Sequence, residues 1–375
     1  MTEKASARRN DWAGEWPLAV AVVTLVATLL GKSVVAEMLD QPATLIGLLV
    51  LICGVILAAA IAIVRHAEIL AHRLGEPAGT LLLTLAITGL EVAMVGFVMS
   101  TGEEKPTLAR DAMYGVVMLV FNGFMGLSLL LGGLRHGEQG YNLFGANAFL
   151  IMILPLSVLG LVLPNYTRST PGPTLSTFQM VFLSVMSVGI YGMFLFVQNQ
   201  RHRDYFTFEE AGDEDAGAHE MEGESRRSTL YHSLMLGVYG LPLVMLAKQM
   251  STPLDAMVSR VGAPVALGGF VLATLVLTPE SIAAVKAAHE NRLQRSINIL
   301  VGSVLAAIGL TIPLVIVISL ATGRGLVLGL DPAEIVMLVL TLGTAALTFA
   351  LSRMNVLLGY VHLLLFAAYV MLMFD

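Results

Sequence analysis

Apolar runs of 18 or more residues recur along the whole 375-residue chain, and they restrict its fold more than any other feature. A run of this length forms a helix that crosses the bilayer core, which is about 30 Å thick. Apolar residues make up 56% of the chain and charged residues only 13%, well below the share in a soluble domain. The sequence therefore predicts an all-α polytopic membrane protein that is surrounded by a lipid bilayer.

We predict about eleven transmembrane helices, the first of which is an extra N-terminal helix. The triplet VVA at 34–36 has the small residues of a signal-peptide cleavage site. The long apolar stretch and the many later spans favour an uncleaved anchor instead. The predicted spans are 17–36, 42–64, 79–100, 111–133, 146–164, 175–198, 229–247, 261–285, 296–320, 332–350 and 354–374.

The distribution of Lys and Arg indicates the orientation. With a cytoplasmic N-terminus, fourteen of these 21 residues fall in inside segments and seven in outside segments, as the positive-inside rule expects. The sequence thus predicts a multi-pass protein of the cell inner (plasma) membrane with its C-terminus outside. The one long polar segment, 200–228, becomes a cytoplasmic linker. Its stretch 209–224 holds eight carboxylates and no Lys or Arg, which predicts disorder, with weak cation sensing as the alternative.

Two glutamates interrupt long apolar stretches. Glu91 lies in LLLTLAITGLEVAMVGFV (81–98) and Glu280 in GGFVLATLVLTPESIAAVK (268–286). A charged carboxylate at the bilayer centre costs at least about 2.5–3.5 kcal/mol, and no Lys or Arg lies deep in a predicted span to pair with either one. The pattern predicts a proton-linked cation site. Two protonated glutamates with only a structural role are the alternative.

The segments around the two glutamates repeat in order. In each half a glutamate span is followed by a charged loop and then by a span rich in small residues, in which Asn122 corresponds to Ser303. Five spans per copy place the two copies in opposite orientations, an arrangement typical of transporters. We therefore divide the chain into an N-terminal tail and extra helix (1–40), a first five-helix repeat (41–199), the acidic linker (200–228) and a second five-helix repeat (229–375). Pro279 and Gly89 are expected to break or loosen the two glutamate helices.

These residues resemble the cation/calcium exchanger superfamily, most closely its bacterial calcium/proton antiporter branch. The resemblance covers nearly the whole chain, and its strongest marks are LEV (90–92), TPES (278–281) and GSVLAAIGL (302–310). It implies that Glu91 and Glu280 are the shared ligands of the metal cation and the proton. It also implies that the Ser of the family's Gly-Ser pattern and backbone carbonyls before each glutamate take part, and these map to Ser303, Asn122, Thr88, Gly89, Thr278 and Pro279.

The implied activity is secondary active exchange by alternating access, with Ca²⁺ as the first candidate for export against entering protons. Two ionised glutamates are neutralised equally by one Ca²⁺ or by two protons, which suits a site that reorients only when loaded. The family often has an Asn four residues after its Ser, but here Gly126 and Ala307 stand at those positions. Because Ca²⁺ takes six to eight oxygen ligands, this departure keeps Na⁺ and K⁺ as further candidate ions.

Other functional classes have little support in the sequence. No P-loop motif is present, so ATP is not the expected energy source. We expect neither a nucleotide nor nucleic acid as a partner, and the chain is predicted to be no enzyme and to need no cofactor besides its transported ions. The alternatives kept are a Na⁺/Ca²⁺ exchanger, an intramembrane hydrolase using Ser303 and His362, and a non-transporting membrane scaffold. We expect His362 to be a packing residue, with proton relay as the alternative.

Overall fold

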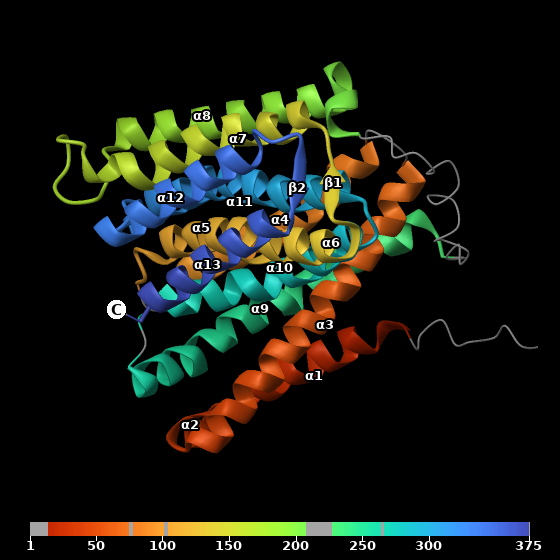
Figure 1. Ribbon diagram of the computed structural model, residues 1–375. Coiled ribbons are helices and arrows are strands. Elements are labelled where there is room, and N and C mark those ends of the chain that lie inside the picture. The colour runs from red at the N-terminus through yellow and green to blue at the C-terminus, as the bar shows by residue number, and fades with distance from the viewer. Residues whose placement is uncertain are drawn as a thin grey trace, which may run out of the picture.

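The computed structural model describes residues 14–74, 78–100, 104–207, 227–262, 264 and 266–374, and these form long helices that run side by side (Figure 1). Seven helical segments are long and apolar enough to cross a membrane, and three shorter apolar helices accompany them. The predicted all-α membrane class is therefore confirmed. The α-helices are α1 (Trp16–Leu30), α2 (Lys32–Asp40), α3 (Pro42–Leu74), α4 (Ala78–Ser100), α5 (Leu108–Val117), α6 (Met125–His136), α7 (Leu143–Ser157), α8 (Thr177–Phe196), α9 (Thr229–Val261), α10 (Ala266–His289), α11 (Leu293–Thr322), α12 (Pro332–Thr348) and α13 (Val356–Leu372).

Short irregular elements interrupt or extend these helices. A π-helical turn, η2 (Met118–Phe124), joins α5 to α6. The remaining turns are η3 (Val158–Val162), η4 (Leu163–Asn165), η5 (Val197–Arg201) and η6 (Arg203–Phe206). Strands β1 (Glu138–Gly140) and β2 (Arg353–Asn355) pair antiparallel and join two loops at one end of the bundle. We call this the linker end, because α8 leads into the predicted linker there and α9 emerges from it. Residues 208–226, which include the acidic stretch, lie outside the described residues.

The first predicted span, 17–36, is not one straight helix. It divides at Gly31 into α1 and α2, whose axes differ by 85°. A Cβ atom at Gly31 would lie 2.7 Å from the carbonyl oxygen of Ala27, so the glycine allows a bend that no other residue could make without strain. Apolar length alone did not reveal this bend.

The expected helix breaks at Gly89 and Pro279 are also absent. Both α4 and α10 continue through these residues without interruption. Proline and glycine are tolerated within membrane helices because neighbouring groups satisfy the freed backbone. The irregular backbone lies instead in η2, which contains Asn122.

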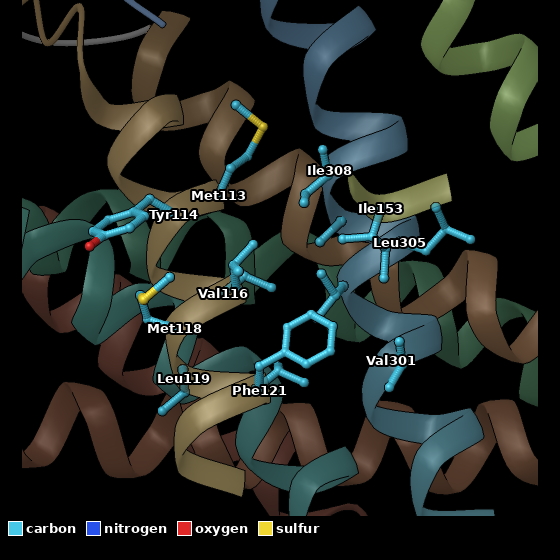
Figure 2. Close-up of a cluster of buried hydrophobic side chains, with 14 of the residues drawn as sticks. Met113, Tyr114, Val116, Met118, Leu119, Phe121, Ile153, Val301, Leu305 and Ile308 are labelled. Carbon is cyan, nitrogen blue, oxygen red and sulfur yellow. The ribbon is translucent and has the colours of Figure 1, made fainter. Parts of the chain in front are cut away.

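The helices enclose two hydrophobic cores. The larger is centred on α5, η2, α7, α8 and α11, and Figure 2 shows Met113, Phe121, Ile153, Val301 and Leu305 interlocking within it. The smaller lies among α1, α3, α9 and α10. Extensive packing pairs α3 with α9, α4 with α11, α10 with α5, α8 with α11 and α6 with α13.

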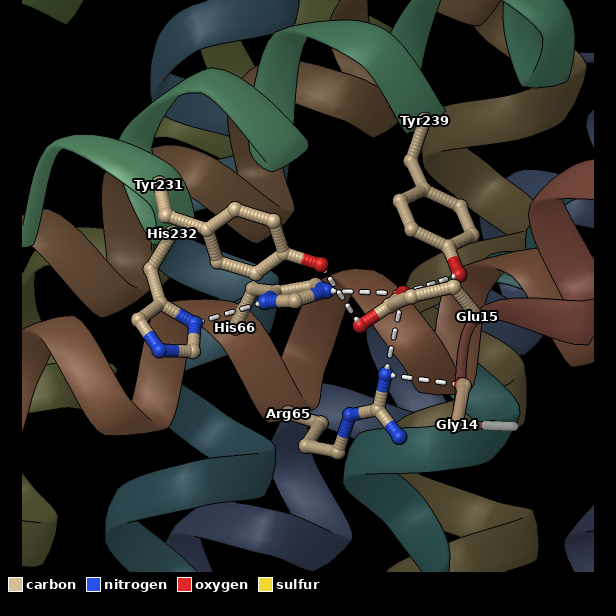
Figure 3. Close-up of polar contacts among 7 residues, drawn as sticks. All are labelled: Gly14, Glu15, Arg65, His66, Tyr231, His232 and Tyr239. Carbon is tan, nitrogen blue, oxygen red and sulfur yellow. Dashed lines mark hydrogen bonds and ion pairs between the residues drawn. The ribbon is translucent and has the colours of Figure 1, made fainter. Parts of the chain in front are cut away.

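A partly buried polar cluster fastens the start of α1 to α3 and α9 at the linker end (Figure 3). Glu15 accepts hydrogen bonds from Tyr239 (2.7 Å) and Tyr231 (3.1 Å), and its carboxylate lies 3.2 Å from the Arg65 guanidinium and 3.3 Å from His66 Nε2. Burial alone raises the pKa of Glu15, but the hydrogen bonds from Tyr239 and His66 and the charges of His66 and Arg65 outweigh it and hold that pKa below its ordinary value of 4.5. Sequence analysis did not predict this cluster, because its members are distant along the chain.

Candidate functional site

The two deep glutamates approach each other inside the bundle. Glu91 on α4 is only 7% exposed, and the carboxylate of Glu280 on α10 is near enough for the two charges to repel each other. Among the residues that the structure describes, no ion pair joins Lys, Arg or His to either of them. Their negative charges are therefore available to a cation or to protons.

Ser303 is the closest polar neighbour of Glu280. Its hydroxyl, on α11, donates a hydrogen bond to the Glu280 carboxylate. The predicted association of these two residues is thus present in the structure. A hydroxyl in this position stabilises a carboxylate and can also present a lone pair to a bound cation.

A cavity of about 210 Å³ leads from Glu280 and Ser303 toward the linker end, and Glu91 is not part of its wall. Its inner part is bounded by Ile87, Glu280 and Ser303, and Ile87 lies one helical turn before Glu91. Toward the linker end its wall carries Glu68 of α3 and Gln198 of η5. Val64, Tyr191, Phe194, Ala283, Asn298, Ile299 and Gly302 complete the lining. The cavity gives Glu280 a partly polar route to that end of the bundle.

The residues expected to supply carbonyls precede the two glutamates within α4 and α10. Thr88 is buried. Gly89 borders open space, because a Cβ atom built there would meet no atom within 4 Å. The Thr278 hydroxyl is engaged with its own helix, donating to the carbonyl of Thr274 at 2.5 Å. Pro279 lies within the continuous helix α10. Because these helices are unbroken, most of their carbonyls are held in backbone hydrogen bonds, and the ligand role of these four residues stays a prediction.

Asn122 is joined to a different set of partners. Its amide nitrogen donates to the Thr341 hydroxyl at 2.8 Å, and its amide oxygen lies 3.4 Å from His362 Nδ1. Nε2 of His362 lies 3.0 Å from the Thr348 hydroxyl. No hydrogen bond links Asn122 to either glutamate among the described residues, so its role as a cation ligand also stays a prediction. The surroundings of His362 are those of a hydrogen-bonded packing residue.

The glycine at position 126 has a packing explanation. A Cβ atom there would lie 3.0 Å from the Leu363 backbone nitrogen and 3.1 Å from His362 Cβ. Opposite it, a Cβ atom at Gly359 would lie 2.8 Å from the Gly126 carbonyl oxygen. The two glycines let α6 and α13 approach closely, which leaves no room for an Asn side chain at 126.

The assembled site suits a weakly coordinated cation. Glu91, Glu280 and Ser303 have side-chain oxygens that could reach a cation between them, and no cluster of three or more His, Cys, Asp or Glu side chains that could hold a metal ion occurs in the described part of the chain. Further ligands would have to come from water, backbone or another hydroxyl. Sequence reasoning missed Glu68, Tyr191, Gln198 and Asn298 on the cavity wall, because polar residues near helix ends carry no signal of facing inward.

Comparisons with known proteins agree with this picture. The family model described as sodium/calcium exchanger protein matches residues 44–199 and 231–374. The Sinorhizobium fredii protein y4hA is 42% identical over 95% of this chain and 96% of its own length. The sodium-potassium/proton antiporter ChaA of Escherichia coli is 40% identical over 85% of this chain and 86% of its own.

Solved structures resemble the fold. The structure of native YfkE has a TM-score of 0.72 at 16% identity, covering 96% of this chain and 99% of that one. The H⁺/Ca²⁺ exchanger CAX has a TM-score of 0.66 at 16% identity, covering 96% and 89% of the two chains. At these identities the likeness concerns the fold alone.

Proposed function

Because the chain belongs to the sodium/calcium exchanger protein family, a member of the cation/calcium exchanger superfamily, we propose that it is a secondary active cation/proton antiporter. In this proposal Glu91 and Glu280 bind the exported cation and the entering protons in turn. The observation that carries it is a pair of neighbouring carboxylates on α4 and α10 that have no basic ion-pair partner among the described residues, one of which, Glu280, lines a cavity.

Charge balance explains why such a site exchanges rather than leaks. With both carboxylates ionised and no cation bound, the site holds two buried negative charges, which are costly to carry past an apolar barrier. Cations or protons remove that cost. The site therefore reorients when it is loaded with either one, and the two flows are coupled.

We propose Na⁺ and K⁺ as the first candidate ions and Ca²⁺ as the second. The 40% identical ChaA is named as a sodium-potassium/proton antiporter, and Gly126 and Ala307 leave few side-chain oxygens for Ca²⁺. Ca²⁺ keeps its place because one divalent ion neutralises both glutamates. The sequence alone favoured the opposite order.

The topology is part of the same proposal. We propose eleven spans, formed by an extra N-terminal helix (1–40) and two inverted five-helix repeats (41–199 and 229–375) around the linker 200–228. The two segments matched by the family model coincide closely with these repeats. Helix packing supports the symmetry, since α4 contacts α11 as α10 contacts α5, and α8 contacts α11 as α13 contacts α6.

The proposed orientation places the linker end in the cytoplasm and the C-terminus outside. The cavity that reaches Glu280 leads toward the linker end, so this orientation makes the structure inward-facing. A cytoplasmic cation then has a path to Glu280 and Ser303.

Proton flux in inverted membrane vesicles tests the function. The vesicles are given an acid interior, Na⁺, K⁺, Ca²⁺ or Mg²⁺ is added separately, and a pH-reporting dye follows the loss of the gradient. We expect Na⁺ and K⁺ to dissipate it in the wild type, and Glu91→Gln or Glu280→Gln to abolish the response. Glu290→Gln is the matched control, because Glu290 lies just beyond α10 and pairs with the exposed Lys286 at 3.7 Å. Full exchange in either deep-glutamate variant would refute the site assignment.

A further inference from the structure

Tyr191 is a buried tyrosine of α8 whose hydroxyl has no hydrogen-bond partner among the described residues. The side chain is held in place, since only 4% of the residue is exposed and a Cβ atom on Gly309 of α11 would lie 3.3 Å from Tyr191 Cβ. Its ring stacks on Phe194 at a centroid distance of 6.5 Å. An unpaired buried hydroxyl costs free energy, so such groups in native proteins are normally satisfied by water or an ion.

The position of this hydroxyl is specific. Tyr191 lines the same cavity as Glu280 and Ser303, which come from α10 and α11. Other described hydroxyls also lack partners, namely those of Ser128, Ser157, Ser187 and Ser296, but none of these residues lines the cavity. Of these residues with an unsatisfied buried hydroxyl, Tyr191 is thus the one that shares the cavity wall with Glu280 and Ser303.

We propose that the Tyr191 hydroxyl is a further ligand of the transported cation, binding it directly or through one water molecule, and that it contributes to ion selectivity. This inference rests on the proposed function of Glu91 and Glu280. Gly126 and Ala307 have no side-chain oxygen that could bind a cation, and the Tyr191 hydroxyl would supply a ligand in their place. Because the hydroxyl is neutral, it adds no charge to the site. Ligands of this kind suit Na⁺ and K⁺, whose single charge needs less compensation than that of Ca²⁺.

A structural role and a ligand role make opposite predictions for Tyr191→Phe. If the hydroxyl is only an unpaired group in the core, its removal leaves transport unchanged and leaves stability equal or higher. If it binds the cation, its removal weakens cation binding. Loss of one hydrogen-bond or ligand contact to a charged group corresponds to about a tenfold change in affinity.

The test combines binding and transport. Binding of ²²Na⁺ and ⁴⁵Ca²⁺ to the purified protein is measured for the wild type, Tyr191→Phe and Tyr360→Phe, and half-saturating cation concentrations are measured in inverted vesicles. Tyr360 is a suitable control because it lies on α13, is 55% exposed and is absent from the cavity wall. Thermal unfolding of each variant in detergent reports whether the fold is kept.

We expect Tyr191→Phe to weaken cation binding about tenfold, to change the Na⁺ to K⁺ ratio of half-saturating concentrations, and to keep the wild-type melting temperature. Tyr360→Phe should match the wild type in all three. If Tyr191→Phe binds and transports as the wild type does while Glu280→Gln is inactive, the ligand role is refuted and the antiporter function stands. If the wild type binds neither ion, or Glu280→Gln exchanges normally, the proposed function fails. If Glu280→Gln exchanges normally, the binding data still decide whether Tyr191 holds a cation.

Discussion

Substitution of Gly359 by alanine tests the close contact between α6 and α13. A Cβ atom at this position would lie 2.4 Å from the backbone nitrogen of Leu130 and 2.8 Å from the carbonyl oxygen of Gly126. Both are backbone atoms, so no side-chain rotation relieves the overlap, and one helix must move by roughly 1 Å to restore ordinary contact distances. Overpacking of this kind costs about 1–3 kcal/mol, and we expect the upper part of that range.

A shift of α13 should also disturb the polar contact between His362 and Asn122, which lies next to the glycine contact. His362 lies on α13 and Asn122 on η2, which continues directly into α6, and their 3.4 Å contact would lengthen if α13 moved away. We therefore expect Gly359→Ala to lower the apparent melting temperature in detergent by several degrees and to reduce exchange. Gly343→Ala in α12 is the control, because a Cβ atom there meets nothing within 4 Å. It should be neutral or stabilising by up to about 1 kcal/mol, owing to the better helix propensity of alanine. Equal melting temperatures for Gly359→Ala and the wild type would refute the packing argument.

Two further predictions concern polar contacts. Ser303→Ala removes the hydroxyl that donates to Glu280 and should raise the half-saturating cation concentration about tenfold in the vesicle assay; an unchanged value would show that this hydroxyl is not used. Glu15→Gln removes the charge that pairs with Arg65 and His66 and should lower the melting temperature at neutral pH. Because the folded-state pKa of Glu15 lies below its ordinary value of 4.5, its contribution is complete above that value and is lost as the pH falls through the folded-state pKa. The stability difference between wild type and variant should therefore shrink in acid, and a difference that stays constant from pH 7 to pH 3 would contradict the assignment.

Features that depend on local sequence could be predicted well. Apolar length placed a helix in each predicted range, and isolation in an apolar run singled out Glu91 and Glu280. The role of these two residues and of Ser303 in a cation site stays a prediction, although the structure does place the Ser303 hydroxyl against the Glu280 carboxylate.

Features that depend on how helices meet could not be predicted. Tyr191 carries no sequence signal that separates a cavity-facing hydroxyl from any other tyrosine in an apolar helix. The Glu15 cluster joins residues more than 200 positions apart. Asn122 contacts Thr341 of α12 and His362 of α13 as well as Met118 of its own segment. The expectation of helix breaks at Gly89 and Pro279 was wrong for the same reason. The surrounding helices decide whether such residues interrupt a membrane helix.

The short pairing of β1 with β2 restricts how the bundle can move. It binds the loop after α6 to the loop before α13, and Gln139 within β1 also donates to the Ala288 carbonyl at the end of α10. Helix ends from both halves of the chain are therefore tied together at the linker end. Helix α3, which lines the cavity, takes no part in this pairing. In the proposed exchange cycle we therefore expect the two paired loops to move together, and closure of the cavity at the linker end to involve wall helices outside the pairing, such as α3.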